Sequence, residues 1–202
     1  AALPELASTG CILVTSAVES VDDSVLKHLG KNHTYKDFVQ VVQLMREAGI
    51  ALAPTFVAFH PWSSVSAYRD LLKKLATLDL VENVPAVQLA IRLLVPQGSR
   101  LMQLPGFPEL VDPFDPEMLG YPWKHRDPAV DRLQTEVQSI AEAGEQQNWS
   151  RTRTFEHIWT AVYRALGVQA PPLKLKSAVP VPHHSEPWYC CAEPNDEQIT
   201  GM

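Results

Sequence analysis

The chain has 202 residues, of which 46% are hydrophobic and 20% are charged, and its net charge is −6. This composition is typical of a globular protein with a proper core and excludes wholesale disorder, while the acidic balance without a basic cluster argues against a nucleic-acid partner. No run approaches the roughly 20 apolar residues of a membrane span, so we expect a cytoplasmic protein with no membrane partner.

Proline divides the chain into three parts, because twelve of its 17 copies fall in two blocks at 105–128 and 171–194. We therefore expect segments at 1–102, 103–170 and 171–202. The abrupt start at Ala1, close to an apolar run, leads us to expect a piece of a longer protein.

The first part alternates apolar runs with amphipathic helices. Residues 11–15 and 50–59 read as buried strands, and a helix is expected from Thr34 to Gly49, with Asp37 completing a capping box. A second helix is expected to start at Ser63 or Ser64. Strands that alternate with helices in this way favour a parallel α/β sheet.

A third strand is expected from Val87 to Leu94. Its alternation puts Gln88, Ala90 and Arg92 on one face, and an inward Arg indicates either a polar cavity or an internal salt bridge. Helices are expected from Asp127, with Pro128 at the first helical position, and from about Thr154 to Leu166. The segment from Pro171 is expected to be extended or disordered.

A series of motifs resembles the second half of a radical S-adenosylmethionine (SAM) barrel. They are Val14-Thr15-Ser16-Ala17-Val18-Glu19-Ser20, Gly30-Lys31-Asn32-His33-Thr34, Arg46-Glu47-Ala48-Gly49-Ile50, the run from Pro54 to Ser64, and the run from Arg92 to Ser99. Cys190-Cys191-Ala192-Glu193-Pro194 is similar to the ending of a radical SAM family in which selenocysteine can replace the second cysteine. The resemblance implies an α/β fold in which residues 7–102 form strands four to six of a partial (β/α) barrel, followed by a helical extension and a proline-rich tail.

The resemblance implies SAM and a [4Fe-4S] cluster as cofactors, and a reducing electron donor as partner. The chain lacks the Cys-x-x-x-Cys-x-x-Cys spacing of that cluster, and Cys11 lies far along the sequence from the two tail cysteines, so no cluster ligand is expected in this chain. The ligands are expected in a missing N-terminal part, without which the piece is expected to be inactive.

The expected SAM site follows from the same resemblance. Glu19 matches the polar residue at the end of the fourth strand, with Ser16 and Ser20 beside it, and its carboxylate can accept ribose hydroxyls. The alternative role for Glu19 is to cap the short helix through Val25 and Leu26. Thr55 and Val57 are expected to contact adenine.

Three further positions complete the expected site. Arg92 is expected to pair with the SAM carboxylate or a substrate anion. His60 is expected to touch the substrate, a small molecule or a peptide that we leave unidentified. Lys31 and His33 are expected to be structural.

Cys190 and Cys191 are the expected catalytic residues of the tail, as nucleophile, redox pair or ligands of a soft metal with His183 and His184. The alternative is two exposed, inert thiols.

The sequence thus leads to a C-terminal part of a radical SAM enzyme that forms a 5'-deoxyadenosyl radical. The alternatives are a non-catalytic metal- or redox-handling partner that displays the Cys-Cys tail and an ordinary aldolase-like barrel enzyme.

Overall fold

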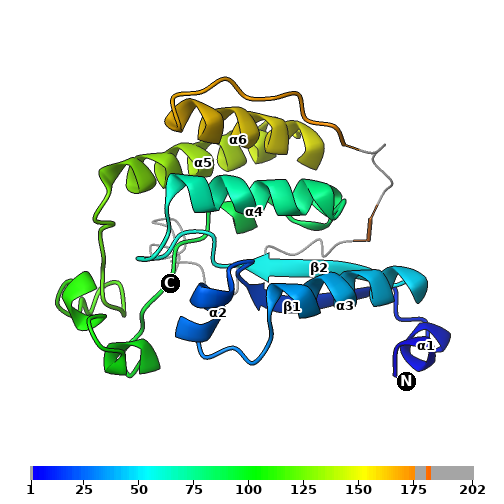
Figure 1. The fold of residues 1–202 in the computed structure, drawn as a ribbon, viewed down its shortest axis with the longest axis horizontal. Coiled ribbons are helices and arrows are strands. Elements are labelled where there is room, and N and C mark those ends of the chain that lie inside the picture. The colour runs from blue at the N-terminus through cyan, green and yellow to red at the C-terminus, as the bar shows by residue number, and fades with distance from the viewer. Residues whose placement is uncertain (1, 176–180, 183–202) are drawn as a thin grey trace.

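The computed structural model describes residues 2–175 and 181–182 and has a mixed α/β architecture. The described residues form six α-helices and one two-stranded parallel sheet that does not close into a barrel (Figure 1). In chain order the elements are α1 (Ala2–Ser8), β1 (Leu13–Glu19), α2 (Asp23–His28), α3 (Tyr35–Glu47), β2 (Ala51–Phe56), α4 (Val65–Thr77), α5 (Pro128–Gln146) and α6 (Arg151–Ala165). Four short 3-10 helices lie between α4 and α5.

The sheet is built from one β-α-β unit, as the alternation of strands and helices predicts. β1 and β2 pair in parallel from Leu13 opposite Ala51 to Ala17 opposite Thr55, and the register then shifts at a bulge before Glu19. Helix α3, which lies in the connection between the two strands, begins with the predicted capping box of Thr34 and Asp37. The helix is terminated at Gly49, whose φ of 70° is the left-handed conformation that glycine adopts readily. Both strands are confirmed, although β1 lies two to four residues later than expected.

The two faces of the sheet have different surroundings. Leu52 and Phe56 point to one face, where the ring of Phe38 on α3 meets Phe56 edge-on with 6.1 Å between ring centroids. The opposite face carries small side chains, and Thr15 and Ala17 on it are exposed. One sheet face is therefore core, and the other is open.

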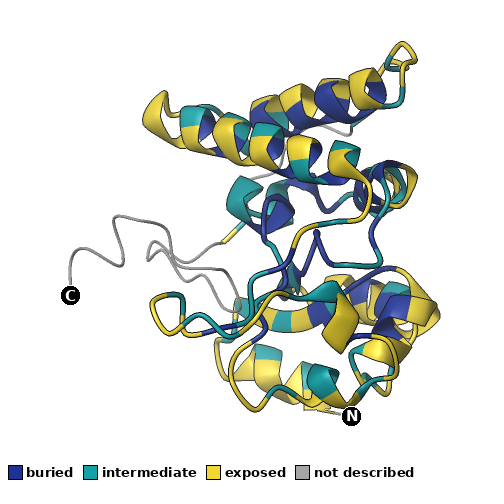
Figure 2. Cartoon of the chain, turned by 90° about the vertical axis from the view of Figure 1, so that its left-hand side faces the viewer, coloured by how far each residue is buried: buried dark blue, intermediate teal, exposed yellow. Residues whose placement is uncertain are grey.

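The described residues have two core clusters, and the larger one joins the sheet to the helices that follow it. It includes Val18, Phe56, Leu72 and Ile158, and so draws on β1, β2, α4 and α6. α4 lies between the sheet and the α5–α6 pair (Figure 1), and α4, α5 and α6 each turn a buried side inward and an exposed side outward (Figure 2). Helices α5 and α6 of the expected extension at 103–170 thus pack on the same core as residues 1–102, whereas Phe107 and Trp123 belong to the second cluster with Val57, Leu93 and Val95.

The predicted third strand at Val87–Leu94 is wrong as a strand. Residues Ala86–Leu89 form a 3-10 helix, and the remaining sheet-like contact is one parallel bridge in which Phe59 N donates to Ile91 O and Leu93 N donates to Phe59 O. Side chains take the neighbouring carbonyl oxygens instead: Tyr68 bonds Leu89 O at 2.9 Å, Gln134 bonds Ala90 O at 3.1 Å and Trp123 bonds Leu93 O at 2.8 Å. A sheet partner is not needed to satisfy these backbone groups.

α5 and α6 are confirmed, and α6 starts earlier than expected, at Arg151. No helix in the described part of the chain has the length and apolar character needed to cross a membrane.

Candidate functional site

The candidate site lies where the carboxyl ends of β1 and β2 run into their following loops. In open parallel sheets this edge is the usual place for ligands, because loops from neighbouring strands converge there. Val57 N donates to Glu19 O at 2.9 Å, so two of the predicted SAM-binding residues are direct neighbours. The β-α-β unit thus brings Glu19, Ser20, Thr55 and Val57 to one edge.

Glu19 sits at the bulge with a φ of 68°, a left-handed conformation that is costly for a side chain other than glycine. Its Oε1 accepts a hydrogen bond from Lys31 Nζ at 2.8 Å, and the side chain is 13% exposed. Its alternative role as a helix cap is wrong, because Asp22 caps α2 by accepting from Ser24 N. The ion pair holds Glu19 at the sheet edge.

Two neighbours of Glu19 shape the same turn. Ser20 is buried, and its Oγ accepts from Asp22 N at 3.1 Å. The ring of His33 approaches Val18 O with its Nε2 at 3.2 Å. Lys31 and His33, which were expected to be structural, therefore both contact the end of β1.

Strand alternation separates two of the predicted residues. Ser16 pairs with Pro54 and shares the core-facing side with Leu52, whereas Thr55 pairs with Ala17 on the open side. Thr15 lies on the open side with Thr55, and the sequence analysis overlooked it. Thr55 pairs with Ala17, and residues two apart in a strand share a face, so the pattern identifies Thr15 as well.

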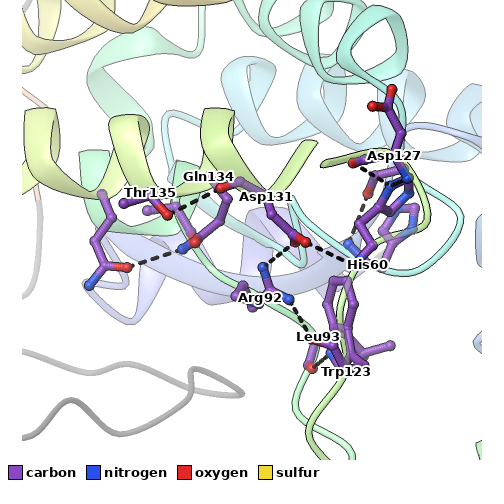
Figure 3. Close-up of polar contacts among 12 residues, drawn as sticks. His60, Arg92, Leu93, Trp123, Asp127, Asp131, Gln134 and Thr135 are labelled. Carbon is purple, nitrogen blue, oxygen red and sulfur yellow. Dashed lines mark hydrogen bonds and ion pairs between the residues drawn. The ribbon is translucent and has the colours of Figure 1, made fainter. Parts of the chain in front are cut away.

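Arg92 makes the internal salt bridge that the sequence analysis left as the alternative to an open polar cavity. Its Nη1 donates to Asp131 Oδ1 at 2.8 Å, its Nη2 donates to Trp123 O at 2.9 Å, and its guanidinium lies 3.9 Å from the centre of the Trp123 ring. The side chain is 16% exposed. Figure 3 shows Arg92 between Asp131 and Trp123. No contact in the described part of the chain joins Arg92 to Glu19, whose charged partner is Lys31.

His60 follows β2 and is buried, with 6% of its surface exposed. Burial lowers its pKa to about 4, which the carboxylate of Asp22 opposes and the nearby His125 and His28 reinforce. Its backbone N donates to Ser63 Oγ at 2.8 Å. The expected substrate residue is therefore a neutral imidazole at neutral pH.

Trp62 forms an aromatic wall beside His60. The ring centroid of Trp62 lies 5.7 Å from that of His60, 4.7 Å from that of His28 and 5.4 Å from that of Phe107. Trp62 is half-buried, so one part of its ring system stays open to solvent.

Cys190 and Cys191, with His183 and His184, lie outside the described residues. Cys11 is half-buried two residues before β1 rather than inside a strand, and its Sγ lies 3.6 Å from Leu13 O. No group of three or more His, Cys, Asp or Glu side chains in the described residues is placed to hold a metal ion.

Comparison with known proteins adds no relative. Searches of protein families, of curated proteins and of solved structures each find no match to this chain.

Proposed function

We propose that this chain is the C-terminal part of a radical SAM enzyme and that it contributes the SAM-facing edge of a half barrel. The observation that carries the proposal is the parallel β1–β2 pair, with an open face of small side chains and Glu19 held by Lys31 where β1 ends. Such an edge has the geometry of a ligand site in parallel α/β proteins.

The open face suits a flat adenosine group. Thr15 and Ala17 on β1, and Ala53 and Thr55 on β2, leave room that larger side chains would fill. Val57, next to Glu19, is 5% exposed and packs with Leu93, Phe107 and Trp123, so in this proposal it supports the edge from the core. The Glu19 carboxylate has lone pairs for two ribose hydroxyls even while Oε1 accepts from Lys31.

Arg92 stabilises this edge of the sheet through its contacts with α5 and Trp123. Arg92 pairs with Phe59 of the segment after β2, and its bonds to Asp131 and Trp123 O tie this pairing to α5. In this proposal Arg92 therefore positions the loop, and its role toward a SAM or substrate anion is secondary. Ser20 shapes the turn after Glu19, and Ser16 supports β1 from the core side.

The cluster itself does not fit the described residues. Cys11 is the one cysteine among them, and three thiolates are needed for a SAM-cleaving [4Fe-4S] cluster. Such a cluster would have to be held by residues outside the described part of this chain, where it would supply the electron for reductive cleavage of SAM. The residues of this chain bind and orient SAM and the unidentified substrate.

Calorimetric titration of SAM into the wild-type chain and into Glu19→Gln tests the site. Losing one charge-assisted partner weakens binding by about 1–3 kcal/mol, roughly a 5- to 150-fold rise in Kd. Glu5→Gln, on exposed α1, is the matched control and leaves the affinity unchanged. Equal SAM affinity in wild type and Glu19→Gln removes Glu19 from the site.

The reaction needs a second measurement. Anaerobic iron–sulfur reconstitution of the full-length gene product, followed by SAM and a low-potential reductant, should release 5'-deoxyadenosine. If SAM stays intact while the protein binds a soft metal, the metal-handling alternative replaces the radical enzyme.

A further inference from the structure

Residues 96–119, which we call the cap segment, lie at the carboxyl edge of the sheet. Figure 1 draws this segment in green, at the end of the molecule toward which β2 points. It contains two short 3-10 helices and no strand or α-helix. Its two ends meet, because Pro96 bridges Gly120 and Tyr121 N donates to Val95 O at 2.8 Å. The cap segment is therefore a long loop closed at its base, and loops of this length in a folded domain are often functional.

One side chain anchors the cap segment to the rest of the protein. Phe107 is 1% exposed and is the only residue from 96 to 119 that is buried. The centroid of its ring lies 5.4 Å from that of Trp62, and both residues belong to the second core cluster with Val57 and Leu29. Trp62 and Val57 follow β2, and Leu29 comes directly after α2 in the connection that leaves β1. Phe107 thus packs with the loops that leave both strands at the candidate site.

Hydrogen bonds do not hold the cap segment over this edge. In the described part of the chain, every hydrogen bond of residues 96–119 either stays within the segment or reaches its base, as when Asp112 N donates to Pro122 O at 2.6 Å. The same residues form no ion pair with any other described residue. Segments with few buried apolar contacts open locally at a lower free energy than the whole protein unfolds.

We propose that the cap segment opens as a unit about its base, with Phe107 as the latch, and that the opening uncovers Trp62 and Val57 at the sheet edge. The contact that keeps it closed is the burial of one aromatic ring, so opening breaks no hydrogen bond or ion pair beyond the base. Trp123 bonds Leu93 O at 2.8 Å and so stays with the rest of the protein. The opening does not depend on the proposed function, whereas its role in admitting SAM or the substrate rests on it.

Thiol labelling of Val57→Cys tests the opening, because this position is 5% exposed in the cluster that Phe107 closes. Mass spectrometry locates each maleimide adduct and so separates the new thiol from the natural cysteines. Labelling should change little with urea below the unfolding transition, since a local opening exposes little surface. Val162→Cys, completely buried on α6 in the larger cluster, is the control and should react only through global unfolding, with a steep dependence on urea.

The latch is tested in the Val57→Cys background. Phe107→Ala should accelerate labelling by about tenfold or more, because the opening then no longer exposes an aromatic ring. Leu119→Ala, at a 72% exposed position of the same segment, is the matched control and should label like the parent protein. Leu93→Cys, at another buried position of the second cluster, replaces Val57→Cys if that variant does not fold.

Two results would overturn the cap. One is labelling of Val57→Cys with the same urea dependence as Val162→Cys, and the other is a labelling rate that Phe107→Ala leaves unchanged. A SAM titration of the wild-type chain separates this proposal from the proposed function. Urea-insensitive labelling without SAM binding rejects the proposed function alone, and SAM binding with labelling only through global unfolding rejects the cap alone.

Discussion

Arg92 is held by three different contacts: an ion pair with Asp131, a hydrogen bond to Trp123 O and the face of the Trp123 ring. Removing one partner of a largely buried pair leaves the other charge with poor solvation. We expect Arg92→Ala to lower the free energy of unfolding by about 2–4 kcal/mol, measured by urea denaturation.

A double-mutant cycle isolates the ion pair. Asp131→Asn and Arg92→Ala should show a coupling energy of about 1 kcal/mol or more, because both changes remove the same interaction. Arg164→Ala, on an exposed ion pair with Glu136, is the control and should change stability by less than about 1 kcal/mol. Additive effects at Arg92 and Asp131 would contradict the pairing.

His60 makes stability depend on pH. Its folded pKa of about 4 lies below the unfolded value near 6.5, so the unfolded chain binds more protons between these values and stability falls as the pH drops through them. The loss should reach about 2 kcal/mol at pH 5 and about 3 kcal/mol below pH 4, while stability above pH 7 is unaffected by this group.

The measurement is the difference between wild type and His60→Gln, because Asp22, His28 and His125 interact electrostatically with His60. Urea midpoints from pH 8 to pH 4.5 should fall less steeply for the variant. A wild-type slope that His60→Gln leaves intact would assign the pH dependence to other groups.

At the scale of elements, α5 and α6 cross where Gly144 meets Thr154. A Cβ added at Gly144 would lie 2.6 Å from Thr154 Oγ1 and 3.1 Å from its Cγ2. Alanine normally stabilises a helix interior by up to about 1 kcal/mol relative to glycine. Here the clash with a buried side chain dominates, so Gly144→Ala should destabilise the fold by about 1–2 kcal/mol.

Thermal and urea unfolding of Gly144→Ala, Thr154→Ala and the double variant test this crossing. The double variant removes the clash and should be more stable than the sum of the two single changes predicts. If Gly144→Ala is more stable than wild type, α5 and α6 can move apart at this contact without a loss of stability.

At the scale of the whole molecule, the continuous core predicts cooperative unfolding. Ile158 on α6 is completely buried in the cluster that also contains Phe56 of β2. Ile158→Ala should lower the free energy of unfolding by about 2–5 kcal/mol, since it removes buried methylene groups and leaves a cavity.

Two probes of Ile158→Ala distinguish one cooperative unit from two. Helical circular dichroism and fluorescence of the Trp residues should give the same shifted urea midpoint, because the sheet and the helices share the core. Separate midpoints would divide the helical segment from the β-α-β unit.

Much of the fold follows from local sequence. The capping box at Thr34, the end of α3 at Gly49 and the start of α5 at Pro128 are short-range signals that backbone geometry obeys directly. The region of Val87–Leu94 was not predictable in this way, because side chains of Tyr68, Gln134 and Trp123 satisfy its carbonyls from distant parts of the chain.

The candidate site likewise has one part that the sequence predicts and another that depends on tertiary contacts. The sequence by itself determined that Glu19, Thr55 and Val57 would meet at one sheet edge, because parallel pairing aligns the ends of neighbouring strands. Only the tertiary structure decided that Arg92 pairs with Asp131 and that His60 is buried, since a helix 39 residues away supplies the partner of Arg92. The spacing of residues fixes local geometry, whereas charge pairing and burial depend on which distant elements pack together.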